Sequence, residues 1–144
     1  MLKIKLICVG DFKENYLKEA EKEYLKRLSK FFEVSTIIVK ESDKEKEGKD
    51  IVSKIDAYAI LLDIKGEEVT SEELALKIDK LSLTNSKLNV IIGGSDGASE
   101  LVKKSVNERI SFGRITLPHQ LARIVALEQI YRSGTILNHI KYHK

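Results

Sequence analysis

The ten residues LNVIIGGSDG, at positions 88–97, join a short apolar run to a glycine-rich turn. The run is rich in β-branched residues, as in a strand that is buried on both faces. The turn holds three of the eight glycines of the chain and lies just before a helix start at Ser99. This order of strand, turn and helix is typical of a parallel α/β sheet.

Apolar runs and helical patterns alternate on both sides of this segment. Thr70 and Glu73 form a capping-box pattern that predicts a helix from Ser71. The other expected strands cover residues 3–9, 34–39, 58–63 and 114–117, and the longest expected helices cover residues 15–30 and 120–133. We expect an α/β fold, with a mostly parallel sheet that has helices on both faces, in a single domain over residues 1–144.

Two segments leave alternatives open. The helix over residues 120–133 is apolar around more than one face, which predicts either deep burial or a subunit interface. Residues 40–50 hold nine charged residues out of eleven, and they form either a mobile loop or the exposed start of a helix that ends near Ile55.

The composition narrows the class of protein. The chain has 144 residues, of which 42% are hydrophobic and 33% charged, so intrinsic disorder is not expected. No apolar run approaches the roughly 18 residues that span a bilayer, and the lysines near the N-terminus do not fit a signal peptide. Cys8 is the only cysteine, and no Cys/His spacing matches a zinc site. We expect a soluble cytoplasmic protein.

Positive charge gathers in the last quarter of the chain. Six basic residues but only one acidic residue, Glu128, lie between Arg109 and Lys144, although the net charge of the whole chain is only +3. All three histidines lie there too. Such a segment suits a partner with a phosphate backbone, and a solvated basic terminus is the alternative.

The glycine turn is the first candidate site. Ligands gather at the carboxyl ends of parallel strands, and glycines there allow close approach to the backbone. The GGxxG spacing differs from the dinucleotide fingerprint, and the turn has no P-loop lysine, so a purely structural turn is the alternative. Asp63, at the end of another strand, either meets a ribose hydroxyl or caps a turn.

Two of the histidines, His119 and His143, lie in different settings. His119 follows a proline and precedes a helix, so a capping or turn role competes with a functional one. His143 lies in the terminal NHIKYHK, residues 138–144, which is either a disordered tail or a segment that folds over a pocket and presents a general base or a stacking ring.

Four motifs together resemble one family. They are LLDIKG at 61–66, IIGGSDG at 91–97, RITLPHQLARIVALEQIYR at 114–132 and the terminal YHK. The combination resembles the ribosomal RNA large subunit methyltransferase H family, which belongs to the SPOUT methyltransferases, and the resemblance runs over essentially the whole chain. It implies a homodimer with a trefoil knot at residues 88–144, a rare exception to the rule against threaded chains.

The resemblance also implies the reaction. Family members transfer a methyl group from S-adenosylmethionine to N3 of a pseudouridine in 23S ribosomal RNA on assembled ribosomes, with neither a metal nor a membrane. The residues implied in cofactor binding are Leu62, Gly93, Gly94, Gly113, Arg114, Ile115, Thr116, Leu117 and Pro118.

The remaining expected site residues lie in the basic quarter. His143 is the candidate general base and Tyr142 the residue that stacks on or orients the target base. Arg114, Arg123, Arg132, Lys141 and Lys144 are the expected RNA contacts. Some members end in NHPYHR, so the final lysine here makes a point-charge contact in place of a bidentate one.

Two other functions fit parts of the pattern. A small α/β nucleotide-binding or signalling domain shares the alternation of strands and helices, but it needs acidic residues clustered at the strand ends, where only Asp63 fits. A noncatalytic ribosome-binding factor needs only the basic C-terminus. Cofactor binding separates this alternative from the enzyme.

Overall fold

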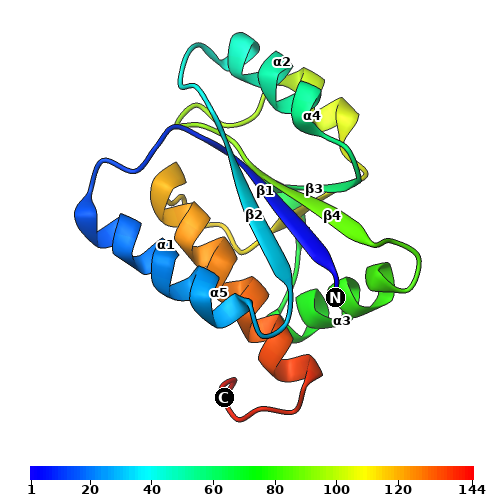
Figure 1. Cartoon of the computed structure of the whole chain (residues 1–144). Coiled ribbons are helices and arrows are strands. Elements are labelled where there is room, and N and C mark those ends of the chain that lie inside the picture. Colours follow the sequence, from blue (N-terminus) through cyan, green and yellow to red (C-terminus); the bar gives the residue numbers. More distant parts are fainter.

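The computed structural model describes all 144 residues as a five-stranded sheet covered by helices on both faces (Figure 1). The strands follow the order β2-β1-β4-β3-β5, and all neighbours are parallel. The strands are β1 (Lys3–Val9), β2 (Glu33–Val39), β3 (Tyr58–Glu68), β4 (Lys87–Ile92) and β5 (Glu108–Ser111). The helices are α1 (Asn15–Leu28), α2 (Lys44–Lys54), α3 (Ser71–Ser82), α4 (Glu100–Ser105) and α5 (His119–Leu137).

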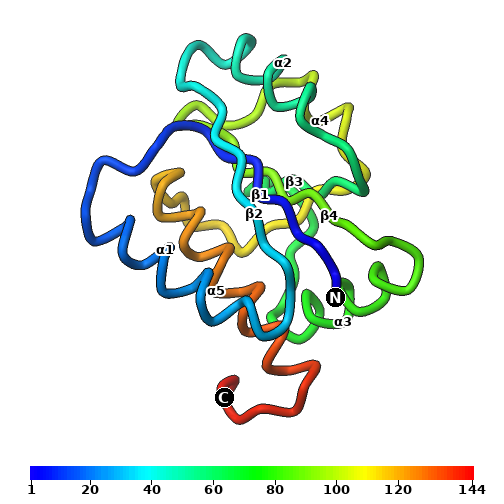
Figure 2. Tube along the Cα trace, viewed as in Figure 1, coloured from blue at the N-terminus to red at the C-terminus, as the bar shows by residue number.

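Side chains that alternate along the strands build two cores. On β1, Ile4, Leu6 and Cys8 join the larger cluster, which also takes residues from α1, α3 and α5. Ile7 and Val9 point the other way, into a smaller cluster with α2 and α4. This period-2 pattern is what a sheet buried on both faces requires. Figure 2 shows the helices of the two cores along the Cα trace, with α1, α3 and α5 on one face of the sheet and α2 and α4 on the other.

Most of the expected helices and strands are confirmed, but the prediction of one strand is wrong. The expected strand over residues 114–117 does not form; the fifth strand is β5, a four-residue edge strand earlier in the chain. Gly113, at φ 126°, follows it in a backbone conformation that few L-residues adopt. The segment after it is apolar yet exposed, with Ile115 83% exposed. Its apolar residues line a cavity and do not enter the sheet.

The structure decides between the alternatives for both segments. Residues 44–50 form the start of α2, which ends at Lys54, so the helix alternative is confirmed. The N-cap Asp43 accepts a hydrogen bond from the Lys46 backbone N–H. Helix α5 packs between α1 and α3 over the sheet, which confirms its deep burial (Figure 1). None of the helices is long and apolar enough to cross a membrane.

Candidate functional site

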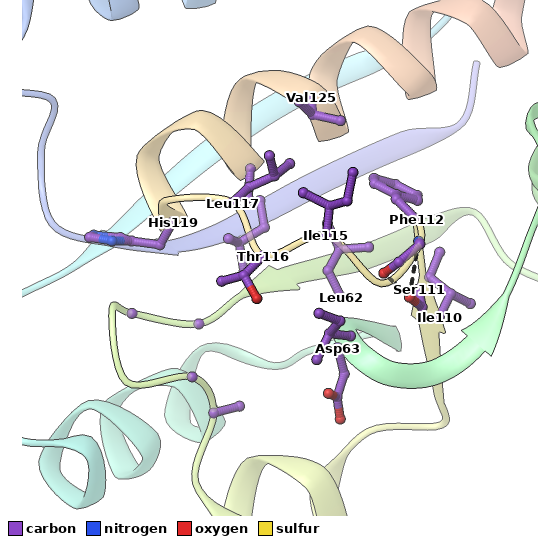
Figure 3. Close-up of a pocket in the computed structure, with 18 residues that line it drawn as sticks. Leu62, Asp63, Ile110, Ser111, Phe112, Ile115, Thr116, Leu117, His119 and Val125 are labelled. Carbon is purple, nitrogen blue, oxygen red and sulfur yellow. Dashed lines mark hydrogen bonds between the residues drawn. The ribbon is translucent and has the colours of Figure 1, made fainter.

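A cavity of about 420 Å³ opens where β4 and β5 end and where the pairing of β3 with β4 stops, at Leu62. Three chain segments enclose it: residues 62–64 of β3, the turn after β4, and residues 110–117 with the first turns of α5 (Figure 3). Its volume lies within the usual range for small-molecule sites. The location agrees with the rule that α/β proteins bind ligands at the carboxyl ends of their strands.

The turn after β4 forms one wall of the cavity. The Gly97 N–H donates to the Gly94 carbonyl at 2.9 Å, which closes the turn, and Gly97 adopts φ +80°. A Cβ added at Gly93 would come within 3.0 Å of the Ala98 nitrogen, and one at Gly94 within 2.6 Å of the Glu47 carboxylate. The two glycines are therefore needed for space, which confirms the structural role of the turn; both also face the cavity.

The segment after β5 forms the opposite wall. The Ser111 hydroxyl accepts from the Gly113 N–H at 3.1 Å and donates to the Gly113 carbonyl at 2.9 Å, which fixes the bend. Beyond it, Ile115 and Leu117 project toward the cavity (Figure 3). An exposed apolar wall of this kind suits a flat, partly apolar ligand.

Seven of the nine residues expected to bind the cofactor line this cavity. They are Leu62, Gly93, Gly94, Gly113, Ile115, Thr116 and Leu117. The other two do not. Arg114 turns outward, where its side chain is 93% exposed and lies 3.6 Å from a Glu68 carboxylate oxygen. Pro118 is the N-cap residue of α5.

Asp63 also lines the cavity, and its carboxylate already has two partners. It accepts the Lys65 backbone N–H at 3.0 Å, as a turn cap does, and the Arg109 guanidinium at 3.2 Å. The turn-capping alternative is confirmed. The ribose contact stays a prediction.

His119 is the first residue of α5 and also lines the cavity. The capping alternative for His119 is wrong, because Pro118 occupies the N-cap position and no side chain caps this helix. The His119 Nε2 atom is buried and has no hydrogen-bond partner.

The C-terminal tail is folded, but not over this cavity. It contacts Glu72 on α3 and Glu128 on α5, one helical turn beyond Val125 of the cavity wall. Figure 1 shows the tail at the C-terminal end of α5. The Tyr142 ring packs edge-on against Tyr131, with centroids 4.9 Å apart, and its hydroxyl donates to Glu128 at 3.1 Å. Burial raises the pKa of Tyr142 to about 12, and the Glu128 carboxylate adds to this shift.

Both ring nitrogens of His143 are engaged in this docked tail. Nδ1 lies 3.1 Å from Arg132 Nη1, and Nε2 lies 2.5 Å from a Glu72 carboxylate oxygen. Since a guanidinium only donates, Nδ1 accepts and Nε2 carries the hydrogen. Glu128 binds Arg132 through both of its carboxylate oxygens and so holds this network in place.

The five expected RNA contacts do not share one environment. Arg114, Lys141 and Lys144 are exposed, whereas Arg132 lies on α5 and contacts His143 of the docked tail. Arg123 is only 3% exposed. Its guanidinium binds the Glu21 carboxylate at 2.7 and 2.8 Å and lies over the Phe12 ring. Arg123 therefore joins α1 to α5, and no phosphate can reach it in this conformation.

Several residues of the site were not predicted. Phe112, Ala122 and Val125 line the cavity, and Glu47 lies behind the Gly94 turn. Phe112 directly follows β5, the strand that we expected at residues 114–117. The charge-rich composition of residues 40–50 does not indicate that the Glu47 carboxylate is buried. No group of three or more His, Cys, Asp or Glu side chains is arranged to hold a metal ion.

Nearly the whole chain is similar to known methyltransferases. A family model described as "Predicted SPOUT methyltransferase" matches residues 2–143. A ribosomal RNA large subunit methyltransferase H from Caldicellulosiruptor saccharolyticus is 42% identical, over 98% of this chain and 99% of the relative. One of the same name from Listeria monocytogenes is 46% identical, over 99% and 100%.

Two solved structures share the fold at low identity. A tRNA (m1G37) methyltransferase from Aquifex aeolicus superposes with a TM-score of 0.56 at 14% identity, over 91% of this chain and 69% of that one. A methyltransferase from Legionella pneumophila, solved with bound S-adenosylmethionine, gives a TM-score of 0.50 at 13% identity, over 92% and 67%.

Proposed function

The chain belongs to the ribosomal RNA large subunit methyltransferase H family of SPOUT methyltransferases, and on this premise we propose that it methylates N3 of a pseudouridine in 23S ribosomal RNA. Membership of this family makes the chain an S-adenosylmethionine-dependent methyltransferase of large-subunit ribosomal RNA. The observation that carries it is the glycine-walled cavity formed by the family's own motifs.

The cavity fits S-adenosylmethionine. Gly93, Gly94 and Gly97 line the cavity without side chains, so a ligand can lie against the backbone of the turn. Ile115 and Leu117 offer apolar walls for an adenine ring, with backbone polar groups beside them. The bound cofactor supplies an electrophilic methyl group on its sulfonium. The protein's main task is then to hold donor and acceptor in line.

N3 of pseudouridine carries an imide proton that must leave, so a group within hydrogen-bond reach assists as general base. We assign this role to His143 and the orientation of the target base to Tyr142. In the docked tail the His143 Nδ1 lone pair faces Arg132 and Nε2–H faces Glu72, so the substrate must displace Arg132 before Nδ1 can accept the proton.

The proposed active enzyme is a homodimer. Neither Tyr142 nor His143 lines the cavity of its own chain, which supports a site completed by a partner's tail. Arg114, Lys141 and Lys144 supply exposed positive charge for phosphate contacts, which position the RNA and do not read its sequence. We further propose one domain over residues 1–144, with the trefoil knot at about 88–144, and a cytoplasmic location on the assembled ribosome.

The test is the transfer of labelled methyl from S-adenosylmethionine to ribosomes that lack the modification, with separated subunits and free 23S RNA in parallel. We expect label at N3 of a 23S pseudouridine, strongest on assembled ribosomes. Cofactor binding without label in 23S RNA would overturn the substrate. The absence of both would favour the noncatalytic ribosome-binding factor.

A further inference from the structure

Helix α2 buries one carboxylate without a counter-ion. Glu47 is only 5% exposed, whereas the charged residues around it on the helix face solvent. Its Oε2 accepts the Ser42 backbone N–H at 2.9 Å. It takes part in none of the ion pairs of the structure. A buried carboxylate of this kind costs free energy unless a positive charge comes near.

This carboxylate lies directly behind the cofactor cavity. Glu47 Oε1 lies 2.6 Å from the place that a Cβ on Gly94 would occupy, and Val9 closes the other side at 3.3 Å. Gly94 itself faces the cavity. Next along α2, Gly48 packs directly on Ser99, the N-cap of α4. Helix α2 therefore supports the glycine turn from behind, and only the turn separates the Glu47 charge from a bound ligand.

The other acidic groups near the cavity are compensated or solvated. The Asp63 carboxylate is 3.2 Å from the Arg109 guanidinium. Asp96, within the turn, is exposed to solvent, which screens its charge. Glu47 is thus the buried negative charge at this wall without a partner, where a low local dielectric makes its field stronger than in water.

The two forms of the cofactor differ in charge at the reacting atom. S-adenosylmethionine carries a sulfonium cation, and methyl transfer leaves S-adenosylhomocysteine with a neutral thioether. We infer that the buried Glu47 carboxylate favours the cationic methyl donor over the spent product, and so assists both donor binding and product release. This inference rests on the proposed function, because it presumes that the cavity binds this cofactor.

The test compares Glu47→Gln with Glu45→Gln by calorimetric titration of S-adenosylmethionine and S-adenosylhomocysteine. Glutamine keeps the shape and still accepts the Ser42 N–H, and Glu45 is an exposed residue of the same helix. We expect Glu47→Gln to weaken binding of the cationic donor on the order of tenfold, as for a charge pair across a short span of protein. Binding of the neutral product should change less than twofold, and Glu45→Gln should change neither.

Equal weakening of both ligands would overturn the inference, because it would assign Glu47 a purely steric role, and so would unchanged affinities. Glu47→Asp, which keeps the charge, should retain the preference for the donor. Should the glutamine variant fail to fold, sinefungin offers a test in the wild-type chain, because it carries an ammonium in place of the sulfonium. It should then bind more tightly than S-adenosylhomocysteine, and weaker or equal binding would overturn the inference. If the wild-type chain binds neither cofactor form, the proposed function fails with it.

Discussion

Two arginines of the basic C-terminal quarter, Arg114 and Arg123, lie in opposite environments. Arg114 has a side chain that is 93% exposed, beside the cavity mouth. Arg123 is 3% exposed and is held by Glu21 on α1. Both were expected to contact RNA, because the sequence shows charge but not burial. Glu21, the partner of Arg123, lies 102 positions away in the sequence, so no local sequence pattern predicts this ion pair.

We predict that Arg123→Ala lowers the free energy of unfolding by about 3 kcal/mol, because it leaves the Glu21 carboxylate without its partner in a mostly buried place. Urea denaturation measures this loss. Arg114→Ala is the matched control and should change the unfolding free energy by less than about 0.5 kcal/mol. Similar effects of the two substitutions would contradict the structural role of Arg123.

Cys8 gives a prediction for alkaline pH. Burial raises the pKa of the Cys8 thiol from 9.0 to about 12, against the opposing effect of Arg123. Between these values the unfolded chain has released the proton and the folded chain still holds it, so stability falls as pH rises from 9 toward 12. Urea unfolding across this range should show a shallower decline for Cys8→Ala than for the wild type. Parallel declines would contradict the assignment.

At the scale of elements, Gly94 and Gly97 of the turn after β4 differ in the space around an added Cβ. A Cβ on Gly94 would lie 2.6 Å from the buried Glu47 carboxylate, whereas Gly97 adopts φ +80° and has no neighbour within 4 Å of an added Cβ. Gly94→Ala should therefore push the turn into the cavity and weaken S-adenosylmethionine binding at least tenfold. Gly97→Ala should cost about 1 kcal/mol of stability through backbone strain and weaken binding much less. Equal losses of affinity would refute the close contact behind Gly94.

Most strands were predictable from their apolar runs. The run of β1 predicted its bounds of Lys3–Val9, and the runs of β2 and β4 came within one residue, although β2 is a half-exposed edge strand. The expected strand over residues 58–63 missed the end of β3 at Glu68, because its last residues are mostly polar and exposed. The strand β5 was misplaced because an edge strand of four residues with Glu108 and Arg109 gives little signal. The apolar residues after it, which line a cavity, have the composition of a strand.

The site was predictable in part for the same physical reason. Glycines after a buried strand mark a place where the backbone must be approached closely, and that identified one cavity wall. The burial of Glu47 and the contact of His143 with Glu72 depend on which helices meet. Such contacts between distant segments leave no trace in local composition.

At the scale of the whole molecule, the separation of cavity and tail is the main feature to explain. The cavity lies beside the first turns of α5, whereas the tail contacts α3 and the later turns of α5. Figure 1 shows the tail at the C-terminal end of α5. In the proposed homodimer, the surface of the dimer supplies both the second half of the site and the contact with the ribosome.

The central claim is that one active site combines the cavity of one subunit with the tail of its partner. Mixed dimers test it most directly. One subunit carries Gly94→Val, which pushes the glycine turn into the cavity, and the other lacks residues 142–144. Two different tags isolate the mixed dimer, native mass spectrometry confirms that subunits have not exchanged, and methyl transfer to ribosomes is measured.

If sites form between subunits, this mixed dimer keeps one intact site and about half of the wild-type activity. The control pairs a wild-type subunit with one that carries both changes, and it should be inactive, because each site then lacks one half. The opposite pattern, an inactive first pairing and a half-active control, would show that each chain uses its own tail and would contradict the account.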